Sequence, residues 1–132
     1  MDPSVLARRF PAQADQVGPA RREVAAYARE HGAIDPDGIA LAVSEAVTNA
    51  VVHAYIDAPA PGEVEVVAKR LPDDGIEIHV SDDGRGLMPR RDSPGLGVGL
   101  PLVAKLAQRF RVETRPGGGT AISMLFAVHD RA

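Results

Sequence analysis

Residues 39–53 read IALAVSEAVTNAVVH and form the most regular apolar pattern in the chain. Apolar residues recur in it at intervals of three and four, which predicts a helix with a buried face. Asp35-Pro36 lies just ahead of it, and proline is well tolerated in the first turn of a helix. Proline and glycine between positions 58 and 62 end the pattern. We therefore expect a helix from about residue 35 to Tyr55.

Two polar residues interrupt this helix at a spacing of four. Glu45 and Asn49 share one helix face, one turn apart. Asparagine weakens a helix, and its neighbours here are apolar. A polar face with a local hydrogen bond would explain the pair. The alternative is a general base at Glu45 and an oxygen ligand for Mg²⁺ at Asn49, since Mg²⁺ needs few protein oxygens beside water and phosphate.

The pattern on either side of this helix predicts one mixed α/β domain. Another helix is expected at 17–31, and a short strand fits at 7–10. After residue 62 the apolar period becomes two, which predicts strands. We expect strands at 63–66, 76–82, 110–114 and 120–128, and a helix at 100–110. Hairpin turns join neighbouring strands, so the sheet should be mixed but mainly antiparallel, covered on one face by helices in a two-layer α/β sandwich.

Asp82 lies at an unusual place in this pattern. It shares a strand face with Ile76, Ile78 and Val80, which is the face that the helices should cover. A carboxylate there is costly unless it has a partner. The glycines of the following segment, residues 83–86, allow a ligand to approach the backbone. Asp82 either caps this turn or accepts a hydrogen bond from a buried ligand.

Thr120 has the same parity on the last strand, so it should lie on the apolar face as Asp82 does. A threonine that simply starts a strand is the plainer interpretation. The four histidines show no metal-ligand spacing, and we interpret them as structural or exposed.

Three alternate glycines, Gly95, Gly97 and Gly99, precede the helix that begins at Leu100. At a helix N-terminus they would expose backbone N–H groups to an anion, which the helix dipole also favours. A flexible loop is the simpler alternative. A dinucleotide fingerprint would need the third glycine one residue later and a strand directly before it, and a P-loop would need a following Gly-Lys-Ser/Thr.

Composition narrows the function classes. The chain has 132 residues and no cysteine, which suits one domain and excludes disulfides, thiolate metal sites and a cysteine nucleophile. A net charge of -3 argues against a nucleic-acid partner. No apolar run is long enough to cross a membrane, and no apolar signal region is present, so we expect a cytoplasmic protein. Acids dominate residues 30–68 and bases dominate 85–115, which would suit a metal cation beside a polyphosphate.

Together these motifs resemble the GHKL ATPase superfamily, whose nucleotide-binding domain is the Bergerat α/β sandwich. Residues 44–50 resemble its N-box, 82–86 its D-x-G-x-G box, 95–100 its second glycine box, and Gly119-Thr120 the Gly-Thr before its last strand. Within the superfamily, residues 41–53 are most similar to the anti-sigma-factor serine/threonine kinases of bacterial partner switching. The resemblance covers nearly the whole chain.

This resemblance implies a protein that binds ATP and Mg²⁺, phosphorylates a STAS-domain anti-anti-sigma factor, sequesters a sigma factor and forms a homodimer. It implies that Glu45 is the base acting on the attacking hydroxyl and that Asn49 is the Mg²⁺ ligand. Asp82 would accept from the adenine amino group, with Thr120 supporting it through a water. The remaining implied nucleotide contacts are Gly84, Gly86, Gly95, Gly97, Gly99 and Leu100.

The segment between Gly86 and Gly95, residues 87–94, is shorter than the ATP lid of many relatives. Arg90 and Arg91 in it could neutralise phosphate charge or lie in solvent. A short lid shields the γ-phosphate less, which bears on kinase efficiency more than on nucleotide binding. The alternatives are a non-catalytic ATP-binding module that sequesters a partner, or a detached ATP-binding domain of the histidine-kinase type. A dinucleotide oxidoreductase is more distant.

Overall fold

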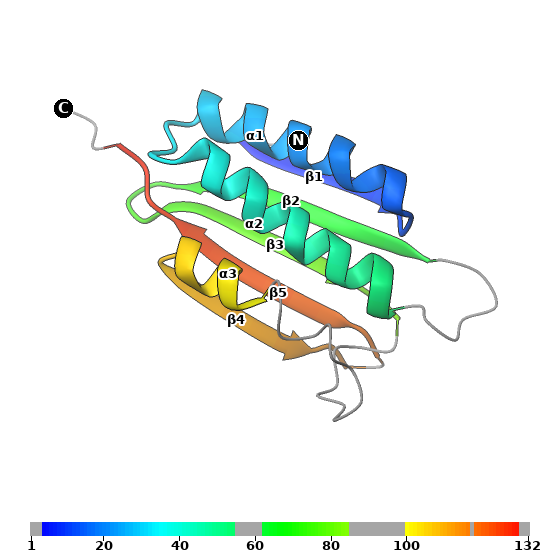
Figure 1. Ribbon diagram of the computed structural model, residues 1–132. Coiled ribbons are helices and arrows are strands. Elements are labelled where there is room, and N and C mark those ends of the chain that lie inside the picture. The colour runs from blue at the N-terminus through cyan, green and yellow to red at the C-terminus, as the bar shows by residue number, and fades with distance from the viewer. Residues whose placement is uncertain (1–3, 55–61, 85–99, 117, 130–132) are drawn as a thin grey trace.

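The computed structural model of the protein describes residues 4–54, 62–84, 100–116 and 118–129. Over these residues it is a two-layer α/β sandwich, with a five-stranded sheet covered on one face by helices (Figure 1). The fold class expected from the sequence is confirmed. In the described part of the chain, no helix is both long and apolar enough to span a membrane.

The sheet is antiparallel at every pairing between described strands. Its strands are β1 (Val5–Pro11), β2 (Glu63–Leu71), β3 (Gly75–Asp82), β4 (Arg109–Thr114) and β5 (Thr120–Phe126). They lie in the order β1-β2-β3-β5-β4. The two expected hairpins are β2-β3 and β4-β5, and β1 is longer than the short strand that we predicted. Because β3 and β5 are neighbours, the end of one lies beside the start of the other.

The helices are α1 (Val17–Glu30), α2 (Pro36–Asn49) and α3 (Leu100–Leu106), with a short 3₁₀ turn at Ala14–Gln16. Asp35 caps α2, because its carboxylate accepts from the N–H of Gly38 at 3.0 Å. Beyond Asn49 the helix continues as a π-helical turn, Ala50–Ala54, and such turns are frequent at functional sites.

The predicted end of the third helix was wrong. The apolar spacing continued to Phe110, but α3 ends at Leu106 and β4 begins at Arg109. Phe110 pairs with Met124 across the sheet and packs against the core from a strand. Its apolar side chain satisfies either periodicity, and tertiary packing decides between them.

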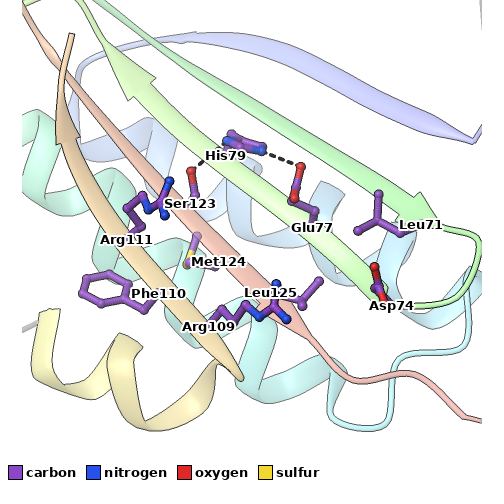
Figure 2. A pocket seen from close by; sticks show the side chains of 10 residues that line it. All are labelled: Leu71, Asp74, Glu77, His79, Arg109, Phe110, Arg111, Ser123, Met124 and Leu125. Carbon is purple, nitrogen blue, oxygen red and sulfur yellow. Dashed lines mark hydrogen bonds and ion pairs between the residues drawn. The ribbon is translucent and has the colours of Figure 1, made fainter.

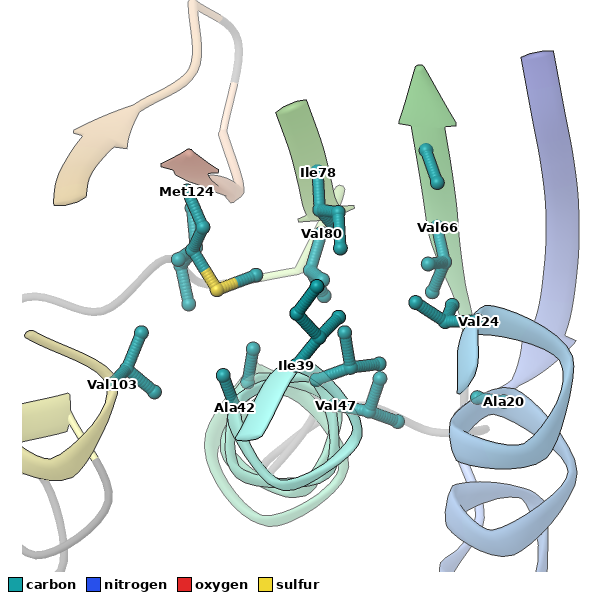
Figure 3. Close-up of a cluster of buried hydrophobic side chains, with 14 of the residues drawn as sticks. Ala20, Val24, Ile39, Ala42, Val47, Val66, Ile78, Val80, Val103 and Met124 are labelled. Atoms are coloured by element: carbon teal, nitrogen blue, oxygen red, sulfur yellow. The ribbon is translucent and has the colours of Figure 1, made fainter. Parts of the chain in front are cut away.

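The core lies between the two layers, with α2 over the middle of the sheet (Figure 3). Ile39 of α2 points toward Ile78 of β3, whereas Val47 points toward the side of α1, and each of the three is at most 1% exposed. Full burial of such a side chain stabilises the fold by about 1.5–3 kcal/mol. Val24 of α1 and Val103 of α3 flank α2 on either side. This packing fixes the C-terminal end of α2 at the same end of the sandwich as the end of β3 and the start of β5 (Figure 1).

Candidate functional site

Three polar side chains are buried in the part of the chain that the structure describes: Asn49, Asp82 and Thr120, which are 5%, 6% and 2% exposed. They come from the last turn of α2, the end of β3 and the start of β5. Asp82 and Thr120 are cross-strand partners on the covered face; their parity predicted the shared face but not this pairing. All three were candidate site residues, and the ends of α2 and β3 and the start of β5 lie at the same end of the sandwich (Figure 1).

The Asp82 carboxylate is held by main-chain donors. Its Oδ1 accepts from the N–H of Gly84 at 3.0 Å, which closes the turn after β3. Burial raises the pKa of Asp82, whereas main-chain hydrogen bonds from Gly84 and Thr120 lower it. The Asp83 carboxylate raises this pKa slightly further, and the Arg115 guanidinium lowers it. Asp82 therefore caps a turn and is also a buried carboxylate. Capping the turn is compatible with accepting a hydrogen bond from a buried ligand.

Gly119 brings the start of β5 against the end of β3. Its φ is +97°, and a Cβ built on it would lie 2.1 Å from the carbonyl oxygen of Asp82. Only glycine fits this contact without displacing the backbone. The Gly-Thr pair therefore has a structural reason: Gly119 allows the close approach, and Thr120 then pairs with Asp82.

Arg115 lies at the site, although no sequence pattern marks it as a site residue. Its Nη1 donates to the carbonyl oxygen of Asp82 at 2.9 Å, although 33 positions separate the two residues in the chain. Its place before a Pro-Gly-Gly-Gly turn marks a hairpin, but a hairpin gives no signal for a contact with a third strand.

At the end of α2, the Asn49 side chain hydrogen-bonds to the backbone rather than to the Glu45 carboxylate. Its Nδ2 donates to the Glu45 carbonyl oxygen at 2.8 Å. This bond orients the amide, and Oδ1 has no hydrogen-bond partner among the described residues. Glu45 is half-buried, and its carboxylate has no hydrogen bond or ion pair to any described residue. Among the described residues, neither Asn49 Oδ1 nor the Glu45 carboxylate has a partner that would compete with a ligand.

Glu45 also borders a surface groove of about 580 Å³ between α1 and α2. Arginines of α1, among them Arg21 and Arg22, line the opposite wall of this groove. Arg29 of the same wall is paired with Asp37 at 2.8 Å.

Several candidate residues lie outside the described residues: Gly86, Arg90, Arg91, Gly95, Gly97 and Gly99. Leu100 is described as the first residue of α3. Helix α3 packs on the core through Val103. The phosphate-binding role of the glycine run stays a prediction.

A second polar group lies on the uncovered face of the sheet (Figure 2). His79 contacts Glu77 Oε1 through Nε2 at 2.7 Å and Ser123 Oγ through Nδ1 at 3.0 Å. The three side chains border a hollow of about 550 Å³ that Arg109 and Arg111 also line. Glu77 and His79 have the opposite parity to Asp82 on β3, so this polar ladder is separate from the buried residues.

The protein is an α/β sandwich with an antiparallel sheet covered by helices on one face, and its buried polar side chains lie where the central helix and central strands end. The chain matches the histidine kinase-like ATPase domain over residues 10–126, and it belongs to this family.

Proteins of two kinds are similar to this chain. The anti-sigma F factor of Clostridium acetobutylicum is 31% identical over 132 residues, covering 88% of each chain. That of Caldanaerobacter subterraneus subsp. tengcongensis is 31% identical over 123 residues, covering 80% of each. Blue-light-activated histidine kinase 2 of Erythrobacter litoralis is 37% identical over 90 residues, which are 65% of this chain and 26% of that protein.

A solved structure agrees in fold. The histidine kinase domain of the Erythrobacter litoralis EL346 blue-light-activated histidine kinase superposes with a TM-score of 0.61 at 24% identity. The match covers 90% of this chain and 62% of that one.

Proposed function

We propose that this protein is an ATP-binding anti-sigma regulator. In this proposal it sequesters a sigma factor and phosphorylates a serine or threonine of a STAS-domain anti-anti-sigma factor. The observation that carries the nucleotide site is the burial of Asn49, Asp82 and Thr120 at one end of the sandwich. Support for the regulatory role comes from the anti-sigma F factors, which match this chain over most of their length. A homodimer and a cytoplasmic location belong to the same proposal.

In this site the adenine would lie against the end of β3. Asp82 would accept a hydrogen bond from the adenine amino group, and Thr120 would support it through a water. A buried carboxylate suits this role, because hydrogen bonds to a charged acceptor are stronger than neutral ones. Gly84 closes the turn beside it and would shape the pocket. The glycines before α3 would turn their N–H groups to the phosphates.

The residues at the end of α2 fit Mg²⁺. Asn49 Oδ1 is an amide oxygen, its orientation is fixed by the bond from Nδ2 to Glu45, and no described residue occupies it. Within the described residues no group of three or more His, Cys, Asp or Glu side chains could form a full protein cage. Mg²⁺ commonly keeps its waters and binds one or two protein oxygens together with substrate phosphates. When bound, the ion would neutralise phosphate charge.

Glu45 would receive the proton of the attacking serine or threonine hydroxyl. Its carboxylate has no competing partner among the described residues, and it lies one helical turn before Asn49. Phosphoryl transfer depends on positioning and charge stabilisation rather than covalent chemistry by the protein, so these few groups suffice. Arg90 and Arg91 would add positive charge from the lid.

Two observations support alternative functions for this protein. The short segment between Gly86 and Gly95 favours a non-catalytic module that captures its partner without transfer. Similarity to a histidine kinase favours a detached ATP-binding domain that phosphorylates a histidine in trans. Wild-type protein that binds ATP but transfers no phosphate, with partner capture unchanged in Glu45→Gln, would select the first alternative. Phosphohistidine on a partner would select the second.

Calorimetric titration with ATP tests the nucleotide site. We expect wild-type protein to bind ATP more tightly with Mg²⁺ than with EDTA, and Asn49→Ala to lose this difference. Thr48→Ala is the matched control, since Thr48 precedes Asn49 on the same helix and is exposed. A Mg²⁺ effect that is as large in Asn49→Ala as in Thr48→Ala would remove Asn49 from the proposal.

A further inference from the structure

Arg115 joins the turn between β4 and β5 to the end of β3. Its main chain closes the turn, because its N–H donates to the Gly119 carbonyl at 2.9 Å and its carbonyl accepts from Gly118 at 3.1 Å. Its side chain leaves the turn and donates from Nη1 to the carbonyl oxygen of Asp82 at 2.9 Å. One residue therefore shapes the turn and contacts the strand that carries the buried carboxylate.

The contact is reinforced by close backbone packing. Gly119 lies so near the same Asp82 carbonyl that a Cβ would be 2.1 Å from it, and 2.7 Å from the Cα of Asp83. A shift of the turn would therefore move the main chain of Asp82. The Arg115 guanidinium also lowers the pKa of the Asp82 carboxyl, in opposition to the effect of burial.

We propose that Arg115 is a positioning residue for nucleotide recognition. It holds the main chain of Asp82 in place and keeps a positive charge beside its carboxylate, so that the ionised carboxylate faces the adenine amino group. This role rests on the proposed ATP site. Arg115 itself would not touch the nucleotide.

The expected effect of Arg115 on the Asp82 pKa also depends on the other charged side chains nearby. Asp83 follows it in the chain and opposes its ionisation. Arg9, Glu63 and Glu65 line a hollow of about 400 Å³ that Asp82, Asp83 and Arg115 also border. Arg9 lies within 4.0 Å of both glutamates. Because Arg115 is exposed, salt should screen its charge, and the contribution should be modest.

The first test needs no nucleotide. The Asp82 carboxyl carbon is followed by NMR as a function of pH in the folded protein at low salt, in wild type, Arg115→Gln, Arg115→Lys and Arg111→Gln. We expect the Asp82 midpoint to rise in Arg115→Gln and to stay near wild type in Arg115→Lys, which keeps the charge. Arg111→Gln is the matched control, since Arg111 is exposed on β4 and pairs with Glu113. An unchanged midpoint in Arg115→Gln would overturn the electrostatic role.

The second test measures ATP affinity in the same four proteins at pH 7 and at the acid end of the stable range. Arg115→Gln should bind ATP about three- to tenfold more weakly, as expected for one lost hydrogen bond from an exposed cation. The loss should be larger at acid pH, and Arg115→Lys should recover most of it. If Arg115→Gln and Arg115→Lys lose ATP affinity equally and the titration midpoint of Asp82 does not change, Arg115 only closes the turn, and the proposal is contradicted. If Asp82 titrates as expected but wild type binds no ATP, the proposed function alone fails.

Discussion

Replacing Asp82 with asparagine should change stability and nucleotide binding in opposite directions. The substitution keeps the shape of the side chain, and its oxygen can still accept from Gly84. It removes the charge from a group that is 6% exposed, and it exchanges one acceptor oxygen for an N–H₂ donor. Asp83→Asn is the matched control, because it removes the same charge from the neighbouring exposed residue.

The expected loss of ATP affinity follows from one charged hydrogen bond. Such a bond contributes about 1.5–3 kcal/mol, which corresponds to about 10- to 150-fold in Kd. Calorimetric titration with Mg-ATP measures it directly. Asp83→Asn should bind nearly as wild type.

The stability effect depends on pH. Burial raises the pKa of Asp82 in the folded state above its ordinary value of 3.8. This raised pKa therefore contributes stability that is fully present below the pKa of Asp82 in the unfolded chain. The contribution is lost as pH rises through the pKa of Asp82 in the folded protein. At pH 7 the wild type bears the cost of a buried ionised carboxylate, and Asp82→Asn does not.

Without nucleotide, Asp82→Asn should thus melt at a higher temperature than wild type at pH 7, and the difference should shrink as pH falls toward 3.8. Thermal unfolding of both variants across this pH range provides the measurement. A lower melting temperature for Asp82→Asn at pH 7, or ATP affinity equal to that of Asp83→Asn, would refute the assignment of Asp82 as a buried ionised acceptor.

Two further substitutions test the packing that supports the site. Gly119→Ala should lower the free energy of unfolding in urea titration by at least about 2 kcal/mol, because a side chain disfavours positive φ and its Cβ would lie 2.1 Å from the Asp82 carbonyl oxygen. Gly18→Ala in α1 is the control, since its Cβ meets only the end of the Arg22 side chain. Equal stability of the two variants would contradict this prediction. Tyr27→Phe should cost about 1–3 kcal/mol, because its hydroxyl accepts from the Arg70 N–H at 2.7 Å, and an unchanged unfolding midpoint would show that this N–H finds another partner.

Simple patterns in the sequence predicted the buried part of the site. Asn49, Asp82 and Thr120 are polar residues at helix and strand positions that should be apolar, and all three are buried. Their roles toward a ligand stay predictions. Periodicity works here because α2, β3 and β5 are central elements whose inner faces are fully covered.

The same patterns failed where two structures satisfy one sequence or where the contact is distant. Phe110 continues a helical spacing and also fits a strand, and only the pairing with Met124 decides. Arg115 contacts a carbonyl that belongs to β3, 33 positions away, and a main-chain acceptor leaves no mark in the sequence. Sequence periodicity therefore predicts which polar side chains are buried, but it does not predict a distant residue such as Arg115 that contacts their main chain.

Transfer of labelled γ-phosphate from ATP to a STAS-domain protein measures the proposed kinase activity directly. The protein is incubated with Mg²⁺, labelled ATP and each STAS-domain protein encoded in the same genome, beside Glu45→Gln and the exposed control Thr48→Ala. We expect acid-stable label on a serine or threonine of one STAS protein with wild type and Thr48→Ala. With Glu45→Gln, transfer should fall about 100-fold or more, as for loss of a general base, while ATP binding is retained. Wild-type protein that binds Mg-ATP yet labels no STAS protein, or transfer by Glu45→Gln at the wild-type rate, would contradict the account.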